Sequence, residues 1–432
     1  MNKDYTAIGF RQGCFNFSNK LTNGVRRRLV ICETLFKTIF LIFVCGISLQ
    51  ACQNYGVKTV QPGIIDAAQI EKITAALIAR QQPETEAQGQ QIQALTEAVT
   101  ALSNGQDTLG TEELVNTAIT GLAQGKTTGA KALFAQLAEN SQTEAKQKAG
   151  ALRHLGILAS LDNTQDALAA YRRATELEPN DAGGWRQLGR LLNQTGKSDE
   201  AIVAFQKQLE LAETNQDQTN IAESYSNLAD VYQARSEFNT AIKLYQKALQ
   251  VNEALANQAV IAKNYNDLGN AYFNTTDLSG QAIACYQKAL QLHEAIGDQQ
   301  QIARQYDNLG NAYQKRGDLP NTLVMYQKAL QLYEKLHVKT GIAINYRNLG
   351  IVYKTSKDLD KAIEMLQKAS QIDQQLGDKN GLAIDYNHLG LAYQLKGNKT
   401  EAKRYYLLSM ELFRILNNQD DAEPIRDLLD EL

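Results

Sequence analysis

Apolar residues recur at helical spacing from about residue 112 to the end of the chain. In the stretch YDNLGNAYQKRGDL (Tyr306–Leu319), apolar or aromatic residues stand at positions 306, 309 and 313. Steps of three and four residues place them on one side of an α-helix. Segments with the strict alternation that indicates strands are missing from the sequence. The pattern therefore predicts an all-α fold.

The same helical segment is repeated along the chain. The pattern Leu-Gly-x-x-Tyr, or a weaker copy of it, begins at Leu155, Leu188, Leu228, Leu268, Leu309, Leu349 and Leu389. From Leu188 onward the copies are 40 or 41 residues apart, and a second apolar segment follows each one. A helix pair of this size cannot bury both of its faces alone, so neighbouring pairs must stack on one another.

These residues resemble the tetratricopeptide repeat, whose pattern is Trp-x2-Leu-Gly-x2-Tyr, then Ala-x3-Phe, then Pro. Trp185 and Pro179 keep the first and last of these residues, whereas later copies carry a tyrosine such as Tyr306 in place of the tryptophan. The 40-residue form is similar to the arrays of kinesin light chains and bacterial signalling scaffolds. The resemblance implies a right-handed superhelical solenoid of stacked helix-turn-helix units.

The pattern also predicts how the chain is divided. We expect a signal peptide of the lipoprotein type at 1–51, a tether at 52–63 and a helical stalk at 64–111. A degenerate leading repeat at 112–148, about seven repeats at 149–415 and a capping helix at 416–432 follow.

The N-terminal segment has a basic start and an apolar end. Three arginines and Lys37 precede the apolar run Thr38–Leu49. Twelve helical residues span roughly 18 Å, less than the ~30 Å of a bilayer core, so the run fits a secretory signal better than a spanning helix. The following Leu49-Gln50-Ala51-Cys52 resembles a bacterial lipobox.

That resemblance implies cleavage before Cys52, lipidation of Cys52 and a place in the bacterial cell envelope. Gln53 stands where an aspartate would direct retention, so the outer membrane is favoured if the host is Gram-negative. Two alternatives stay open: the segment is an uncleaved anchor, or the match to the motif is accidental. The 37 residues before the apolar run are long for such a signal, which is compatible with a translation start nearer Val25.

Composition and motifs argue against catalysis and against nucleic acid. The 44 Lys and Arg residues balance 47 Asp and Glu residues, so no overall positive charge attracts nucleic acid. None of the five cysteines forms a CxxC pair, and no HExxH motif occurs. The sequences GKT at 125–127 and GKS at 196–198 lack the first glycine of a phosphate-binding loop. We expect no enzyme, no metal and no cofactor, and we interpret Cys285 as a packing thiol.

A binding surface remains as the source of function. We number each first helix so that Tyr306 and Gly310 are positions 4 and 8; positions 2, 5, 6, 9 and 12 then lie on the opposite side. The family resemblance implies that this side lines a concave groove. The expected groove residues are Asn227, Asp230, Lys263, Asp267, Asn270, Arg304, Asn308, Asn311, Arg347, Asn348 and His388.

Asparagine recurs at position 6, in Asn227, Asn308 and Asn348. An amide both donates and accepts hydrogen bonds, which suits the backbone of a bound segment. Two interpretations are open. The amides hold an extended partner segment, or each one bonds to the neighbouring repeat and fixes the twist of the array.

The sequence therefore predicts a membrane-anchored scaffold or adaptor that binds a peptide or protein partner in its concave groove. The alternative is a regulatory sensor that binds a response regulator or a signalling peptide.

The lipobox resemblance gives the first testable prediction. Fatty-acid labelling in the host should mark the wild-type chain, and Cys52→Ser should lose the label and keep residues 1–51. Mature wild-type protein that still contains residues 30–45 would contradict the lipoprotein interpretation.

Overall fold

A computed structural model describes residues 98, 112–123, 126–140, 144–275, 279–430 and 432. These residues form helices joined by turns, and no strand occurs among them. The expected signal peptide, the tether and Cys52 lie outside the described residues. The helices are α5 (Glu112–Ala123), α6 (Thr128–Glu139), α7 (Ala145–Ala159), α8 (Thr164–Leu177), α9 (Ala182–Gln194), α10 (Ser198–Thr214), α11 (Gln218–Ala234), α12 (Phe238–Leu255), α13 (Gln258–Phe273), α14 (Ser279–Ile296), α15 (Gln299–Lys315), α16 (Leu319–Leu336), α17 (Lys339–Thr355), α18 (Leu359–Leu376), α19 (Lys379–Leu395), α20 (Lys399–Ile415) and α21 (Gln419–Asp430).

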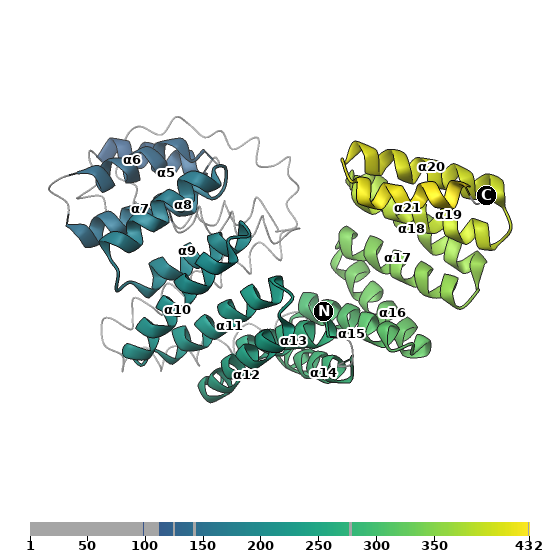
Figure 1. The fold of residues 1–432 in the computed structure, drawn as a ribbon, viewed down its shortest axis with the longest axis horizontal. Helices are drawn as coiled ribbons and strands as arrows, with labels where there is room; N and C mark the ends of the chain where they lie inside the picture. Colours follow the sequence, from purple (N-terminus) through teal and green to yellow (C-terminus); the bar gives the residue numbers. More distant parts are fainter. Residues whose placement is uncertain (1–97, 99–111, 124–125, 141–143, 276–278, 431) are drawn as a thin grey trace, which may run out of the picture. The chain divides into compact units, whose positions relative to one another are not determined.

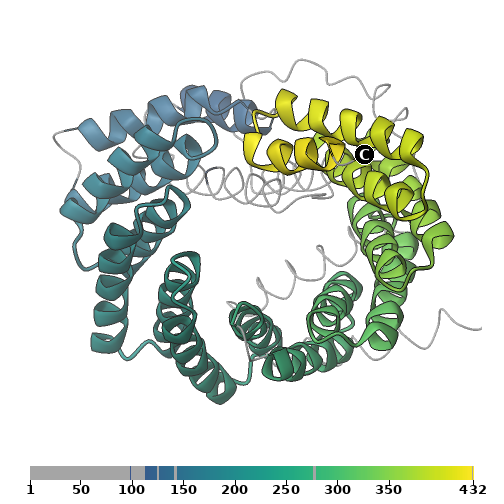
Figure 2. The same ribbon diagram turned by 45° about the vertical axis from the view of Figure 1, so that its right-hand side comes forward.

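The helices pack in chain order, as the all-α solenoid prediction requires. Each helix contacts the next one along the chain, and Figures 1 and 2 show the antiparallel pairs following one another. From α7 onward the odd-numbered helices are the first helices of the repeats and the even-numbered helices are the second. The first helices of neighbouring repeats also touch, as α9 touches α11 and α17 touches α19. Within the described part of the chain, no helix is long and apolar enough to span a membrane.

Most repeats are held together by a close approach at position 8, where a glycine faces a large side chain of the second helix; α11 has Ala229 at this position, opposite the buried Tyr245. A Cβ atom on Gly310 would lie 2.5 Å from the ring of Tyr326 on the second helix, far inside contact distance. Tyr326 is fully buried. Gly350 meets Leu366 in the same way, with a Cβ–Cγ distance of 2.6 Å. In these repeats the glycine makes room for the large side chain that the second helix places directly against its backbone.

Short turns and caps separate the helices. Gly317 has a φ of +77°, which ends α15, and the next residue, Asp318, caps α16 by accepting from the backbone N–H of Asn321. Gly377 and Asp378 repeat this arrangement between α18 and α19. At the equivalent turn before α17 a histidine, His337, adopts the left-handed conformation with φ of +56°.

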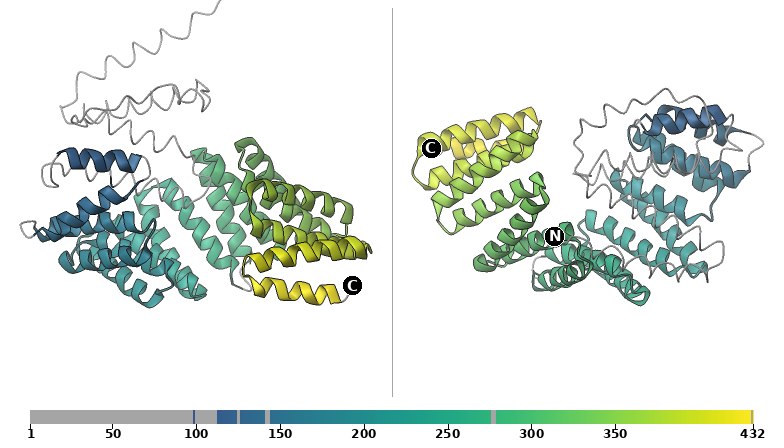
Figure 3. Two further views of the ribbon diagram at one scale, coloured as in Figure 1. Left: turned by 90° about the horizontal axis from the view of Figure 1, so that it is seen from above. Right: turned by 180° about the vertical axis from the view of Figure 1, so that it is seen from behind.

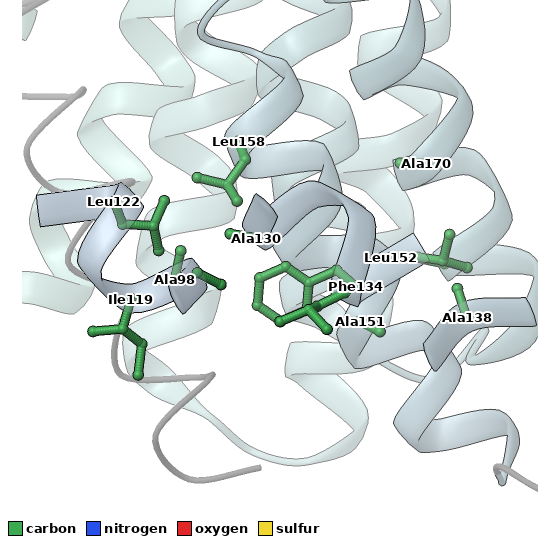
Figure 4. Close-up of a cluster of buried hydrophobic side chains, with 13 residues drawn as sticks. Ala98, Ile119, Leu122, Ala130, Phe134, Ala138, Ala151, Leu152, Leu158 and Ala170 are labelled. Carbon is green, nitrogen blue, oxygen red and sulfur yellow. The ribbon is translucent and has the colours of Figure 1, made fainter. Parts of the chain in front are cut away.

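The N-terminal end of the described array has its own apolar core. Figure 4 shows Ala98 against Ile119 and Leu122 of α5 and Phe134 of α6, and all four are buried. The expected stalk at 64–111 includes Ala98, and the rest of that range lies outside the described residues.

The C-terminal end is closed by α21. Ile425 is buried, and Leu428 and Leu429 are half-buried against Phe413 of α20. Figure 3 shows α20 and α21, in yellow, lying side by side. This helix covers the apolar face that the last repeat would otherwise expose.

Polar side chains meet at the junction between two repeats. They come from position 5 of the first helix of one repeat, from the C-terminal part of the second helix of that repeat, and from position 3 of the first helix of the next repeat. At one junction Asn252 donates to Asn264 over 2.6 Å, and Asn264 donates to Ser226 over 3.3 Å. At the next, Gln305 donates to Asn266 over 3.0 Å. The types of side chain thus differ between junctions, whereas the three positions that meet are the same.

The later junctions are charged. Burial raises the pKa of Asp307 to about 6, and hydrogen bonds from Tyr333 and Asn345 oppose that rise. One repeat further on, the same three places hold Arg347, Asp373 and Asp385. Arg347 Nε lies 2.5 Å from Asp385, and another guanidinium nitrogen contacts Asp373.

This last cluster is deeply buried. The side chains of Asp373 and Asp385 are 3% and 0% exposed. Burial raises the pKa of Asp385 to about 7 despite the nearby Arg347, and Asp373 raises it further. One arginine cannot neutralise two buried carboxylates, so Asp385 holds its proton more tightly in the folded state than in the unfolded state.

The sign of the pH dependence follows from this shift. Between about pH 4 and pH 7 the folded state binds a proton at Asp385 that the unfolded state has lost, so the contribution of Asp385 to the free energy of unfolding falls as pH rises. Asp385→Asn cannot ionise. The free energy of unfolding of Asp385→Asn minus that of the wild type should therefore be about 1–3 kcal/mol larger at pH 8 than at pH 4.5.

Urea unfolding followed by circular dichroism at both pH values measures this difference. Glu411→Gln, which removes an exposed carboxylate of α20, serves as the control and should show no comparable change. An Asp385→Asn difference that stays constant across this pH range would contradict the assignment.

Candidate functional site

The first helices present the side of positions 2, 5, 6, 9 and 12 away from the buried core of their own repeats. Position 9 is occupied by contacts within the array. Tyr326 donates its hydroxyl proton to Asn311 over 2.6 Å, and Tyr286 donates to Asn270 over 2.9 Å. Tyr245 donates to Asp230 in the same way. The side-chain oxygens of these three expected groove residues therefore accept a hydrogen bond from a tyrosine hydroxyl on the second helix of their own repeat.

In part of the array the residue at position 9 changes together with the ring it faces. Phe205 and Leu366 replace the tyrosine in two repeats, and their position 9 residues are Arg190 and Ile351. In the last repeat position 9 is Leu391, and the Tyr406 hydroxyl donates to Gln394 at position 12 over 2.6 Å instead. Satisfying that hydroxyl is a structural role, because a buried polar group without a partner costs about 1–3 kcal/mol.

The residues at position 6 make different contacts in different repeats. Asn227 donates to Gln208 of α10 over 3.3 Å, and Asn308 donates to Asn266 of the preceding repeat over 2.9 Å. Both are contacts to a neighbouring helix, as the interpretation of a fixed twist expects. Asn348 is half-buried, and among the described residues no hydrogen bond joins its side chain to another group. Asp267 pairs with Lys263 over 2.7 Å.

Arg347 differs from its expected role. Its side chain is 13% exposed and lies between Asp373 and Asp385 at the repeat junction. Its charge is compensated inside the protein, so it does not present a cation to a groove ligand. The helical-wheel argument fails here because position 5 lies at the edge between the groove and the neighbouring repeat, and both carboxylates come from helices further along the chain.

A cavity of about 810 Å³ opens on the groove side of α9, α11 and α13. Three expected groove residues, Asn227, Asp230 and Lys263, contribute to its wall. The remaining lining residues are Arg190, Asn193, Gln194, Phe205, Thr219, Glu223, Ser226, Asn252, Leu255, Asn257, Val260 and Asn264. The cavity wall therefore includes residues at positions 2, 5, 6 and 9 of α11, as expected for the groove side.

The charges around this cavity are largely paired. Glu223 contacts Arg190 over 2.8 Å and Arg186 over 2.9 Å, and Lys263 contacts Asp267. Burial raises the pKa of Asp230, although the Tyr245 hydroxyl and the nearby cations act in the opposite direction. The polar floor consists of amides, including the buried Asn252 and Asn264. Such a surface offers donors and acceptors without a strong net charge.

Further along the array the groove side is more positive. Lys354 at position 12 of α17 lies 3.3 Å from Nδ1 of His388 at position 6 of α19. Burial lowers the pKa of Lys354, and burial together with Lys354 and Arg347 lowers the pKa of His388 to about 4. The imidazole is therefore neutral at pH 7. Arg304 at position 2 of α15 is exposed.

The described residues provide little for catalysis. Cys285 is buried, and burial raises the pKa of its thiol to about 11, so the reactive thiolate is rare at neutral pH. His293 is buried and its pKa is lowered by burial. Among the described residues, no three His, Cys, Asp or Glu side chains come together in a way that could hold a metal ion.

Several cavity residues escaped the sequence reasoning. Arg190 belongs to a repeat with weaker motif residues, and Asn252 and Leu255 lie on a second helix rather than a first. Asn252 could have been identified from the sequence, because an asparagine on a buried helix face normally has a hydrogen-bonding partner.

The chain is similar to several solved structures. The protein PH0952 from Pyrococcus horikoshii, a signal-transduction ATPase with numerous domains and a tetratricopeptide repeat sensor, is 15% identical with a TM-score of 0.51. The match covers 87% of this chain and 67% of that one. The apo form of RapI is 15% identical with a TM-score of 0.50, and the match covers 62% of this chain and 99% of RapI. BtubC (BKLC) from P. vanneervenii is 23% identical with a TM-score of 0.46, covering 51% of this chain and 92% of that one.

No curated protein matches the chain. The family model of the tetratricopeptide repeat matches residues 181–254, 260–335, 301–375 and 341–415. Together these segments cover more than half of the 432 residues. They also coincide with the helix pairs from α9 to α20. The chain belongs to the tetratricopeptide repeat family.

Proposed function

We propose that the chain is a membrane-anchored tetratricopeptide repeat scaffold that binds an extended segment of a protein partner along the groove side of its first helices. The observation that carries this proposal is the cavity on α9, α11 and α13, which is open to the groove and lined by residues from successive repeats. Repeat proteins of this architecture use such continuous surfaces to bind other chains.

The chemistry of the cavity fits a peptide backbone. Its amides both donate and accept hydrogen bonds, as the backbone N–H and C=O groups of an extended segment require. Leu255 and Val260 are 41% and 36% exposed and line the same cavity. They offer an apolar contact for one side chain of the partner. At the cavity wall Glu223 is already paired with two arginines and Lys263 with Asp267, so the cavity does not favour a highly charged ligand.

The groove side of α15, α17 and α19 favours an acidic ligand. Lys354 is half-buried beside a neutral His388, and Arg304 is exposed. A carboxylate of the partner would compensate this positive charge. The proposed segment is therefore polar and uncharged where it meets α9–α13, and acidic where it meets α15–α19.

The anchor is part of the same proposal and rests on the sequence Leu49-Gln50-Ala51-Cys52. A lipid on Cys52, followed by the tether at 52–63, would hold the array at the surface of a bacterial envelope membrane. A single acyl chain binds a membrane weakly, so several chains on one cysteine, as in bacterial lipoproteins, would be needed for stable anchoring.

Site-specific photo-crosslinking tests the binding surface. A photoreactive residue at Val260 lies in the cavity wall, whereas one at Val203 lies on the second helix α10 and is 62% exposed. Crosslinks to a partner should form from position 260 and not from position 203. Lys354→Ala should lower the yield from position 260 about 5- to 30-fold, the loss expected for truncating an interfacial charge. Lys263→Ala should lower it less, because Asp267 already compensates the charge of Lys263.

Circular dichroism of both lysine variants provides the control for folding, since Lys263 is 64% exposed and its removal should leave the array intact. Equal crosslinking from positions 203 and 260 would contradict the proposed surface. Insensitivity to Lys354→Ala alone would contradict the acidic end of the segment and leave the cavity assignment standing.

A further inference from the structure

The last second helix, α20, differs from its equivalents on its exposed face. After the core residue of each preceding repeat from α10 onward, the chain has a Gln-Lys pair, and after Tyr406 it has Leu407-Leu408. The preceding pairs begin at Gln206, Gln246, Gln287, Gln327 and Gln367. Leu407 and Leu408 are 44% and 37% exposed, and Ile415 on the same face is 55% exposed.

The Gln-Lys pair has a role inside the array. Gln246 donates to the Tyr272 hydroxyl of the next repeat over 3.0 Å, and Lys247 lies over the ring of Tyr225. The helix that follows α20 is α21, and it has no tyrosine that could accept from a glutamine at this position. That explains the loss of Gln but not the gain of two exposed leucines and an isoleucine. Grouped exposed apolar residues on a helix face are typical of a surface that is covered by another molecule.

The charges of the two final helices differ in sign. On the exposed face of α20, Lys403, Arg404 and Arg414 outnumber Glu411. Arg404 is engaged with Glu401 at 3.3 Å and with the ring of Tyr405, so Lys403 and Arg414 remain as the available cations. The neighbouring helix α21 exposes five carboxylates, at Asp420, Asp421, Glu423, Asp427 and Asp430, against one arginine, Arg426.

We propose that the exposed faces of α20 and α21 form a surface on which a second copy of this chain docks. About a two-fold axis, Leu407 and Leu408 of the two copies pack against each other, while Lys403 and Arg414 of one copy face the carboxylates of α21 in the other, and the same contacts are made in reverse. An anionic membrane would be attracted by α20 and repelled by α21. A second copy presents carboxylates to the cations of α20 and cations to the carboxylates of α21.

The size of the surface sets the expected strength. Helices of 17 and 12 residues are roughly 25 Å and 18 Å long and about 10 Å wide, so two such faces side by side offer on the order of 500 Å² per copy. This is near the lower limit for a specific interface. The dimer should therefore be weak, with a Kd on the order of micromolar to tens of micromolar.

Sedimentation equilibrium of the full chain in mild detergent tests the proposal. The wild type should show a monomer–dimer equilibrium in this range. Leu407→Gln with Leu408→Lys installs the residues of the five preceding repeats, so folding should be kept, and the Kd should rise at least tenfold. Lys403→Glu with Arg414→Glu should also raise the Kd. Val203→Lys replaces an exposed valine of α10 and should leave it unchanged.

Three outcomes would overturn the proposal. One is a wild-type chain that stays monomeric up to several hundred micromolar. Another is a dimer whose Kd is unaffected by the Leu407→Gln, Leu408→Lys variant. The third is a monomeric chain that binds vesicles containing phosphatidylglycerol through these leucines, which would make the face a membrane contact.

Discussion

The contact between the glycine at position 8 and the large side chain of the second helix is the constraint on which the array depends. It brings two helix backbones close enough that only a hydrogen atom fits between Gly310 and the ring of Tyr326. Because the ring is pinned there, its hydroxyl reaches the far side of the first helix and meets Asn311. One packing contact thus fixes both the core of the repeat and one position of its groove side.

The same constraint divides the groove side into residues that serve the array and residues that are open to a ligand. In three repeats position 9 accepts a hydrogen bond from the tyrosine of the second helix, and position 5 lies at the polar junction with the next repeat. Ser226, Asn266, Asp307 and Arg347 occupy that junction position in turn, each with partners of matching chemistry. Junctions that differ in chemistry disfavour stacking of the wrong repeats, because a mismatched pair would leave a buried polar group unsatisfied.

Much of the fold could be predicted from the sequence, since a 40-residue period, helical spacing and Gly-Asp turns are local signals. The observed helices follow that period through α20. The site was less accessible. Arg347 meets carboxylates 26 and 38 residues away, and no local pattern shows that those helices bring two aspartates to its side. The spacing places Tyr306 on the same side of its helix as Leu309, yet Leu309 is buried whereas Tyr306 is half-buried, with its hydroxyl 3.4 Å from Glu294. Helical periodicity indicates a face, whereas burial at the edge of a face depends on the neighbouring repeat.

A comparison of two glycine substitutions tests the central constraint most directly. Gly310→Ala places a Cβ 2.5 Å from the Tyr326 ring, whereas Gly280 in α14 has no atom within 4 Å of its equivalent position. Urea unfolding should show that Gly310→Ala lowers the free energy of unfolding by about 1–3 kcal/mol through overpacking. Gly280→Ala should raise it by up to about 1 kcal/mol, because alanine favours the helix. Equal effects of the two substitutions, or a neutral Gly310→Ala, would contradict the account.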